Sequence, residues 1–144
     1  MHLTVYTDYS LRMLMYLAVK QSNRATIAEV AAAYGISKAH LTKVAHQLGL
    51  AGYVRTVRGK GGGLGLARLS TEIRLGDVVR RTEPDMALVP CFEPVNAACP
   101  IVPACGLRGA LHEARQAFLA VLDRYSLDDL VQRRAELASL LHAA

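Results

Sequence analysis

The 144-residue chain has no apolar run that approaches the length of a membrane span, and its first residues lack the basic-then-apolar pattern of a secretory signal. A span needs about 20 consecutive apolar residues, so the sequence predicts no transmembrane helix and a location in the cytoplasm. Internal repeats and low-complexity tracts are absent as well. Hydrophobic residues nevertheless make up 52% of the chain, which predicts one folded unit with a modest core rather than disorder.

Cysteine is scarce, and its few copies are gathered in one place. The chain has three, Cys91, Cys99 and Cys105, in a stretch that prolines interrupt. An odd number excludes complete pairing within one chain, and thiols in the cytoplasm serve more often as metal ligands or redox centres than as disulfides. The spacings of seven and five residues are too wide for zinc knuckles and favour a loop around an iron–sulfur cluster. Structural zinc with His112 as a fourth ligand, metal-free redox thiols and inert buried cysteines stay open as alternatives.

Acidic residues are rare in the first half of the chain. Residues 1–70 contain nine Lys or Arg and two Asp or Glu, a net charge of +7, whereas residues 71–144 contain eight and ten, a net charge of −2. The basic half is the candidate for binding a polyanion such as DNA. Charge alone leaves a solvated basic surface as an equal alternative.

The first half also predicts two short helices around a glycine-containing turn. A helix over residues 8–20 is followed by Thr26 with a glutamate three residues later, which has the form of a capping box. The helix that it opens ends at Gly35, and Ser37 can cap the next helix, residues 38–48. The second helix has an apolar inner stripe and a polar, basic outer face, which describes a helix-turn-helix. The inner stripe consists of Leu41, Val44, Ala45 and Leu48.

Alternating apolar and polar residues then flank a glycine-rich turn at residues 59–63, which predicts a β-hairpin. A hairpin directly after a helix-turn-helix is the wing of a winged-helix domain, and its glycines allow close approach to a phosphate backbone. A nucleotide-binding P-loop is disfavoured, because Lys60 is not followed by Ser or Thr and a strand comes next. The predicted DNA-contacting residues are Ser37, Lys38, His40, Thr42, Lys43 and His46 in the second helix, and Arg55, Arg58 and Lys60 in the wing.

A heptad seam follows the cysteine stretch. Apolar residues recur there at intervals of four and three, at Leu107, Leu111, Ala114, Phe118, Val121 and Tyr125. One narrow apolar stripe on a long helix favours dimerisation over packing within its own domain. We therefore predict a mainly α fold with a small β-hairpin wing, in which a winged helix-turn-helix (1–82) and a cysteine-containing cluster-binding loop (83–106) precede a long dimerisation helix with short C-terminal helices (107–144).

An enzyme is not expected. Cys105 with His112 as its base would be the simplest nucleophilic pair, but no oxyanion-hole or pocket motif accompanies it.

Four segments, together with the three cysteines, carry a resemblance that covers essentially the whole chain. They are residues 3–12 (LTVYTDYSLR), 34–38 (YGISK), 57–63 (VRGKGGG) and 73–80 (IRLGDVVR). On these residues the chain resembles the iron–sulfur winged-helix transcriptional regulators, a family that includes the nitric-oxide-sensing repressor NsrR and the cluster-biogenesis regulator IscR. IscR-like members carry a histidine ligand three residues after the third cysteine, where this chain has Arg108. That departure favours the NsrR branch.

The resemblance implies a homodimeric repressor that binds a near-palindromic operator in double-stranded DNA and releases it when nitric oxide attacks an iron–sulfur cluster. The three cysteines would hold one cluster per subunit, 4Fe–4S rather than 2Fe–2S, and Asp8 of the partner subunit would supply the remaining ligand. A hard carboxylate oxygen on a soft cluster marks an exchangeable corner. From the residues alone, Asp8 is a first-turn carboxylate that stabilises the helix dipole, with Arg12 one turn later within reach. Regulation by iron or cluster supply is the alternative within the family.

Overall fold

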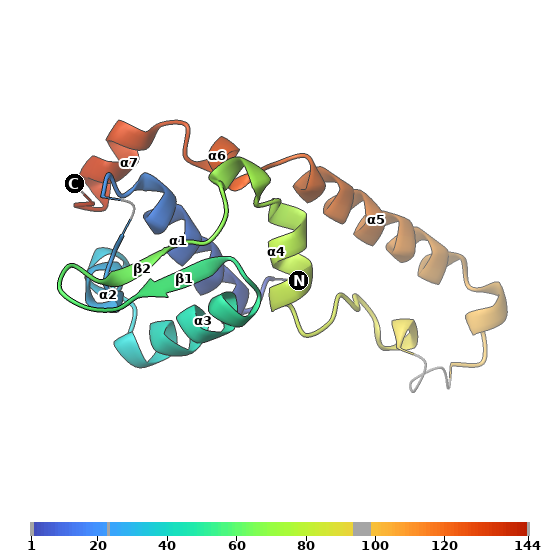
Figure 1. Ribbon diagram of the computed structural model, residues 1–144. Coiled ribbons are helices and arrows are strands. Elements are labelled where there is room, and N and C mark those ends of the chain that lie inside the picture. Colours follow the sequence, from blue (N-terminus) through green and yellow to red (C-terminus); the bar gives the residue numbers. More distant parts are fainter. Residues whose placement is uncertain (1, 23, 94–98, 144) are drawn as a thin grey trace.

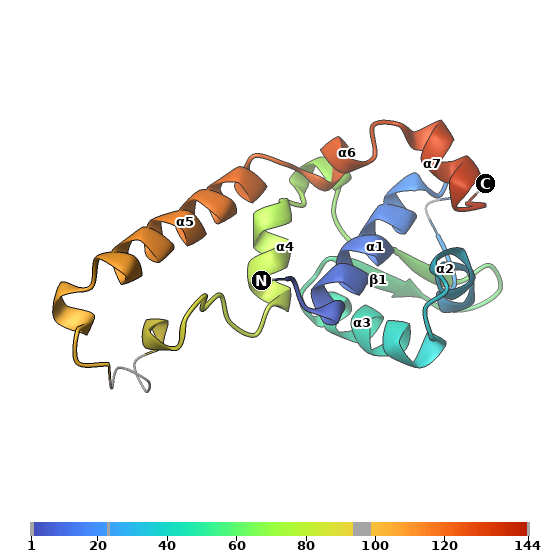
Figure 2. The ribbon, with the colours of Figure 1, turned by 180° about the vertical axis from the view of Figure 1, so that it is seen from behind.

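The structure is a computed structural model that describes residues 2–22, 24–93 and 99–143. A compact body carries an arm, in which the chain runs outward and then returns along one long helix (Figures 1 and 2). The described helices, with η for 3₁₀ helices, and strands are α1 (Val5–Val19), α2 (Ile27–Tyr34), α3 (Lys38–Leu50), β1 (Val54–Val57), β2 (Gly63–Leu66), η1 (Ser70–Glu72), α4 (Leu75–Thr82), η2 (Pro90–Phe92), η4 (Val102–Ala104), α5 (Gly106–Asp123), α6 (Leu127–Leu130) and α7 (Arg134–Leu140). The predicted fold class, mainly α with one small hairpin, is confirmed.

The central helix of the body is α1. It begins at Val5, earlier than the predicted range of 8–20, because the Thr4 Oγ1 accepts the backbone N–H of Thr7 at 3.2 Å and caps the helix there. A fully buried apolar side chain contributes about 1.5–3 kcal/mol, so the core around α1 supplies most of the folding free energy. Its members include Met13, Leu14, Tyr16 and Leu17 of α1, Leu41, Val44 and Leu48 of α3, Leu64 of β2, Val78 of α4, and Leu127 and Val131.

The helix-turn-helix forms as the sequence predicts. The Thr26 N–H donates to Glu29 Oε2 at 2.6 Å, and the Glu29 N–H donates to Thr26 Oγ1 at 3.1 Å, which completes the capping box of α2. Gly35 ends α2 with φ of 65°, a left-handed conformation that is cheap for glycine. The Ser37 Oγ accepts the N–H of His40 at 3.2 Å and starts α3, which extends two residues beyond the predicted end at residue 48.

The wing is an antiparallel hairpin in which Val54 pairs with Leu66 and Val57 pairs with Gly63. The turn between them needs glycine, because a Cβ on Gly62 would lie 2.3 Å from the carbonyl oxygen of Val57. Ala25, just before α2, extends the hairpin through two backbone hydrogen bonds with Leu64, of 2.9 and 2.7 Å. The wing is therefore anchored directly to the start of the helix-turn-helix.

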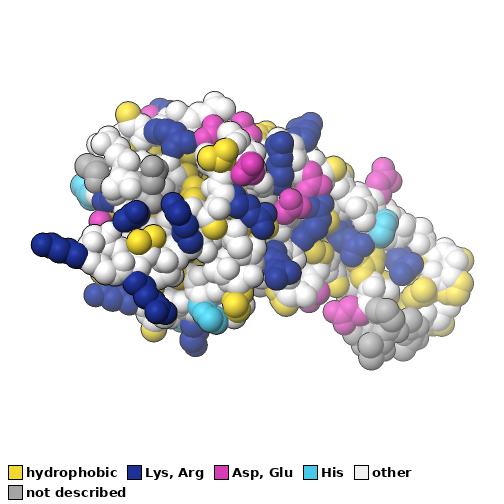
Figure 3. All heavy atoms as spheres, viewed as in Figure 1, with side chains coloured by type: hydrophobic (Ala, Val, Ile, Leu, Met, Phe, Trp, Pro, Cys, Tyr) yellow, Lys and Arg dark blue, Asp and Glu magenta, His cyan; other side chains and the backbone are white. Residues whose placement is uncertain are grey.

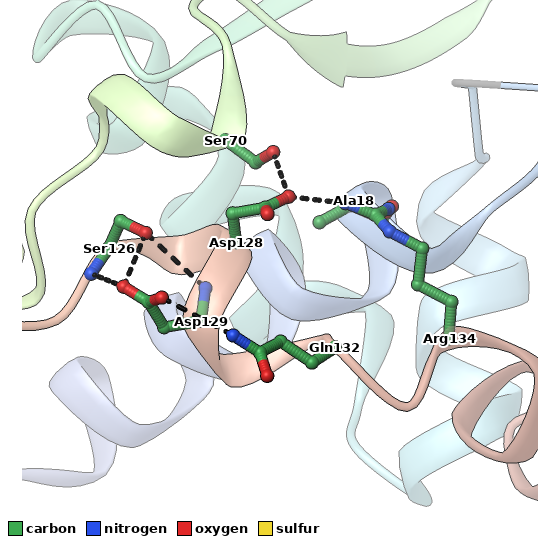
Figure 4. Close-up of polar contacts among 7 residues, drawn as sticks. All are labelled: Ala18, Ser70, Ser126, Asp128, Asp129, Gln132 and Arg134. Carbon is green, nitrogen blue, oxygen red and sulfur yellow. Dashed lines mark hydrogen bonds and ion pairs between the residues drawn. The ribbon is translucent and has the colours of Figure 1, made fainter.

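The C-terminal helices α6 and α7 close the body rather than continuing the arm. Arg134, at the first turn of α7, donates to the carbonyl oxygen of Ala18 at the end of α1, and its second nitrogen lies 2.6 Å from Asp128 Oδ1 in α6 (Figure 4). Asp128 Oδ1 also accepts from the Ser70 hydroxyl at 2.8 Å. Arg134 and Asp128 together thus link four segments of the body: α1, η1, α6 and α7. None of the helices in the described ranges combines the length and the apolar character that a membrane crossing needs.

The capping box of α2 should make the stability of the fold depend on pH. The backbone N–H of Thr26, and then the Lys20 ammonium, lower the pKa of Glu29. A carboxyl whose pKa is lower in the folded state stabilises the fold above its unfolded pKa, and this contribution is lost as the pH falls through the folded value. We expect Glu29→Gln, which keeps the acceptor and removes the charge, to cost about 0.3–1 kcal/mol at neutral pH.

The free energy of unfolding, measured by urea titration, should therefore differ between wild type and Glu29→Gln at neutral pH. The difference should shrink below about pH 4, where the carboxyl becomes protonated in both states. A difference that stayed constant down to that pH would contradict a role for the charge of Glu29.

Candidate DNA-binding face and cysteine site

The outer face of α3 presents the predicted contact residues to solvent. Lys38, His40, Thr42, Lys43 and His46 are all exposed, while the inner stripe is buried as predicted. The Thr42 hydroxyl donates to the carbonyl oxygen of Lys38 at 2.8 Å, so its proton is used inside the helix. His40 also has a neighbour from α1, since its ring lies 6.1 Å from that of Tyr9.

The wing presents Arg55, Arg58 and Lys60, which are exposed. Among the described residues, none of these three, and neither Lys38 nor Lys43, has an ion-pair partner. Unpaired cations are available to phosphates without first breaking a protein contact. Figure 3 shows Lys and Arg side chains spread over the body around the hairpin, whereas hydrophobic side chains gather at the far end of the arm.

Sequence reasoning missed Arg24. Its Nη1 donates to the carbonyl oxygen of Gly61 at 3.3 Å, which places an exposed cation beside the tip of the wing. The position lies far from the wing in sequence, and the bridge between Ala25 and Leu64 brings it there. The only available signal was the excess of basic residues in the first half of the chain, which does not identify a position.

The three cysteines lie in the arm as free thiols. Cys91 lies in η2, half-buried, and Cys105 caps the start of α5, where its Sγ accepts the backbone N–H of Arg108 at 3.4 Å. Cys99 is exposed. The predicted loop over 83–106 thus contains two short 3₁₀ helices, η2 and η4.

The segment with Cys91 is held against α5. The Arg108 Nε donates to the carbonyl oxygen of Cys91 at 3.2 Å. The ring of Phe92 meets the ring of His112 at 6.1 Å, edge to face, and the guanidinium of Arg115 lies 4.8 Å from the Phe92 ring centre. His112 Nδ1 in turn lies 3.2 Å from Arg115 Nη2. His112, which the sequence offered as a zinc ligand, therefore has its Nδ1 engaged by Arg115.

The donor chemistry of the site fits an iron–sulfur cluster. Thiolates are the preferred protein ligands of such clusters, and each cysteine is at least partly accessible. The described side chains do not, however, gather three potential ligands within reach of one metal ion. Residues 94–98 lie outside the described part of the chain. The three cysteines therefore have the chemistry that an iron–sulfur cluster needs. Binding the cluster requires a movement that brings their thiols together.

Asp8 lies in the first turn of α1, half exposed at the side chain. The Arg12 Nε donates to Asp8 Oδ1 at 3.0 Å and lies 2.9 Å from Oδ2, which confirms the predicted contact between them. The Arg12 guanidinium also lies 5.7 Å from the ring centre of Tyr34, and burial raises the pKa of Tyr34 to about 12. This phenol is thus neutral, and Arg12 is the charged group that faces Asp8.

The base of the arm is tied to the body at both ends. At its start, the backbone N–H of Thr4 donates to Glu83 Oε1 at 2.8 Å, beside the buried bond of 2.9 Å between the Thr7 and Thr82 hydroxyls. At its end, the guanidinium of Arg80 in α4 makes two hydrogen bonds, of 2.7 and 2.6 Å, to the carboxylate of Asp123 in α5. The cysteine segment thus begins and ends on helices that pack in the body.

The apolar seam, which runs along α5 and ends at Tyr125 just after the helix, is largely uncovered. Leu107, Phe118, Val121 and Tyr125 are 67%, 37%, 44% and 42% exposed, and Leu119 is the one residue of α5 that is buried. Phe118 of the seam also lines a groove of about 620 Å³ between α5 and the segment that follows α4. Exposed apolar surface of this extent is typical of a face that a partner covers.

The fold and the exposed basic face define a winged-helix, DNA-binding transcriptional regulator. The family model Rrf2, described as an iron-dependent transcriptional regulator, matches residues 3–133. The HTH-type transcriptional regulator NsrR of Geobacillus kaustophilus is 49% identical over 142 residues, which cover 98% of this chain and 97% of that protein. NsrR of Bacillus subtilis is 48% identical with the same coverage. The chain belongs to the Rrf2 family.

Solved structures agree on the fold. IscR of T. potens superimposes with a TM-score of 0.74 at 22% identity, covering 92% of this chain and 88% of that one. The predicted resemblance to the family of NsrR and IscR is confirmed, and the named relatives are transcriptional regulators. The individual DNA contacts and the cluster ligands stay predictions.

Proposed function

We propose that the protein is a homodimeric repressor that holds an iron–sulfur cluster on Cys91, Cys99 and Cys105 and releases its operator in response to nitric oxide. One observation carries the proposal: the chain's only thiols lie in an arm outside the DNA-binding face, in a protein 49% identical to an NsrR. A cluster held there would supply iron for nitric oxide to attack, with 4Fe–4S favoured over 2Fe–2S and Asp8 of the partner subunit as the fourth ligand. The protein acts in the cytoplasm, where its operator lies.

On DNA, the two copies of α3 enter successive major grooves of a near-palindromic operator. Ser37, Lys38, His40, Thr42, Lys43 and His46 are the proposed base and phosphate contacts of each α3. Arg55, Arg58 and Lys60 hold the backbone or the minor groove beside it. Phosphate contacts make the affinity fall with salt, while base contacts select the sequence. The chain divides accordingly into a DNA-binding part (1–82), a sensing segment (83–106) and a dimerisation part with the C-terminal helices (107–144).

The switch rests on the two ties at the base of the arm. The hydrogen bond of Thr4 to Glu83 joins the start of the cysteine segment to α1, and that of Arg80 to Asp123 joins the end of α5 to α4; α1 in turn packs against α3. A rearrangement of the cysteine segment is thereby transmitted to the helix that supports the recognition helix. If the partner subunit's Asp8 is also a ligand, the same event removes a link between subunits and changes the spacing of the two α3 helices.

The test uses full-length protein purified without oxygen. Iron and acid-labile sulfide should be present together, and nitric oxide should change the visible spectrum. Operator affinity, read by fluorescence anisotropy, should be highest for the loaded protein and at least about tenfold lower for the metal-free and nitric-oxide-treated forms, a coupling of the usual size for a regulator. Equal affinities in all three forms would rule out the switch.

The family description, iron-dependent regulator, favours a second candidate: a response to iron or cluster supply. Its signature in the same assay is a difference between loaded and metal-free protein with no effect of nitric oxide on the loaded form. A structural zinc site would give zinc without sulfide in the metal analysis.

A further inference from the structure

The contacts around η2 connect the segment of Cys91 with the part of α5 that follows Cys105. On α5, the residues that touch the segment of Cys91 are Arg108, His112 and Arg115, and Cys105 caps the helix one turn before them. Their spacings of three, four and three residues put all four positions on one face of α5. The apolar seam uses a neighbouring face of the same helix. The stripe with Arg108, His112 and Arg115 therefore contacts the cysteine segment of the same chain. The apolar seam is available to a partner.

Arg108 is the residue that both of these cysteines share. Its side-chain Nε donates to the carbonyl oxygen of Cys91 at 3.2 Å, while its backbone N–H donates to the Sγ of Cys105 at 3.4 Å. Phe92, the residue after Cys91, is clamped between the ring of His112 and the guanidinium of Arg115. Three contacts thus hold the Cys91 turn on α5: the hydrogen bond from Arg108 to the Cys91 carbonyl, and the contacts of Phe92 with His112 and Arg115.

Cys99 has no comparable support among the described residues. It is exposed, and its hydrogen bond within the described ranges is a backbone one, in which its carbonyl oxygen accepts the N–H of Val102 at 3.2 Å. Among residues 83–93 and 99–106, the side-chain contacts of the segment are thus gathered around Cys91 and Cys105.

We propose that Arg108 is a positioning residue that holds Cys91 against Cys105 in the metal-free protein, so that these two thiols form a preformed half-site and Cys99 closes it when the cluster is loaded. The inference rests on the proposed function, since it assigns an order to the same three ligands. Preorganisation favours loading because the loop around two ligands is already closed before iron arrives. Loss of the cluster then frees the Cys99 thiol, while Cys91 stays docked on α5.

The closing experiment measures thiol alkylation in metal-free, reduced, full-length protein, with iodoacetamide as the probe and mass spectrometry to resolve each cysteine. In wild type, Cys99 should react fastest and Cys91 should be protected. Arg108→Ala should accelerate Cys91 by about tenfold, the factor that corresponds to the net contribution of one hydrogen bond. Cys105 should be unchanged, because the N–H that it accepts comes from the backbone of residue 108 and survives the substitution.

Two further variants distinguish loss of the Arg108 hydrogen bond from loss of its charge and from general unfolding. Arg108→Lys retains a donor and a positive charge and should restore much of the protection of Cys91. Phe92→Ala should expose Cys91 without touching Arg108. Arg124→Ala, which removes an exposed arginine at the other end of α5, is the matched control and should leave all three rates as in wild type.

Reconstitution with ferrous iron and sulfide gives the second readout. Arg108→Ala should load several-fold more slowly and change the visible circular dichroism of the loaded protein, and Arg108→Lys should recover both. Equal labelling of Cys91 in wild type, Arg108→Ala and Phe92→Ala would overturn the inference, as would unchanged loading in Arg108→Ala. If no variant, wild type included, takes up iron, the proposed function fails, whereas the alkylation pattern still decides the docking of Cys91.

Discussion

Replacing Val121 in the apolar seam with aspartate is expected to convert the proposed dimer into a monomer and to lower operator affinity by roughly 10²–10⁴-fold, because a dimer binds its second half-site as an intramolecular event. Val121 is 44% exposed in the isolated chain, so the substitution costs little in the monomer. At a subunit interface the same carboxylate would be buried without a partner, at a cost of several kcal/mol. Sedimentation equilibrium reports the assembly state, and anisotropy with full and half operators reports the binding.

Gln116→Asp is the control for Val121→Asp. It adds the same charge to an exposed position of α5 that lies away from the seam. We expect this variant to stay dimeric and to bind the operator as wild type does, apart from the small loss that one extra negative charge causes near DNA. A monomeric wild type, or a Val121→Asp protein that stays dimeric, would show that the seam packs on something other than its own copy.

The local rules of helix capping and hairpin turns account for most of what the sequence could predict about the body. Thr26, Gly35 and Ser37 act through neighbours within four residues, so the pattern of residue types was sufficient to place α2 and α3. The start of α1 was predicted three residues late, because its cap, Thr4, precedes the apolar periodicity that marks the helix. A periodicity count finds the buried face of a helix, but the cap decides where the helix begins.

The long-range contacts of the site could not be predicted in the same way. Arg24 reaches the wing tip, and Glu83 reaches the start of α1, across separations of 37 and 79 residues. Gly76 is another example: a Cβ there would lie 1.9 Å from Asp123 Oδ1, so glycine is what allows the Arg80–Asp123 pair to form against α4. The local sequence of α4 does not predict that position 76 must be glycine, because this depends on where α5 ends.

The cysteine site falls between these two cases. Residue type and spacing identify the three thiols, and a resemblance to known regulators supplies their role. The sequence does not reveal that, among the described residues, Cys91 and Cys105 are supported by contacts with one stripe of α5, which also touches Phe92. The same helix carries the seam on an adjacent face. A change in how the cysteine segment packs on α5 can therefore alter how the seam packs.

Asp8→Ala is expected to have a large effect on the loaded protein and almost none on the fold. In the structure the contact of Asp8 is an exposed ion pair with Arg12, a kind that contributes about 0–1 kcal/mol, so the metal-free variant should unfold within that range of wild type. If the carboxylate of the partner subunit's Asp8 is a cluster ligand, the loaded variant should have an altered visible spectrum and lose its cluster at least about tenfold faster.

Arg12→Ala is the control that separates ligation by Asp8 from a structural role. It breaks the same ion pair from the other side and leaves the carboxylate in place. If Asp8 only stabilises the first turn of α1, each variant should lose a small amount of stability, with Asp8→Ala losing slightly more because it also removes the charge at the helix N-terminus, and neither should change the spectrum. If Asp8 is a ligand, Asp8→Ala should exceed Arg12→Ala in both the spectral change and the rate of cluster loss. Arg12→Ala should then have an intermediate effect, because an arginine that orients a carboxylate acts on the metal only through that carboxylate.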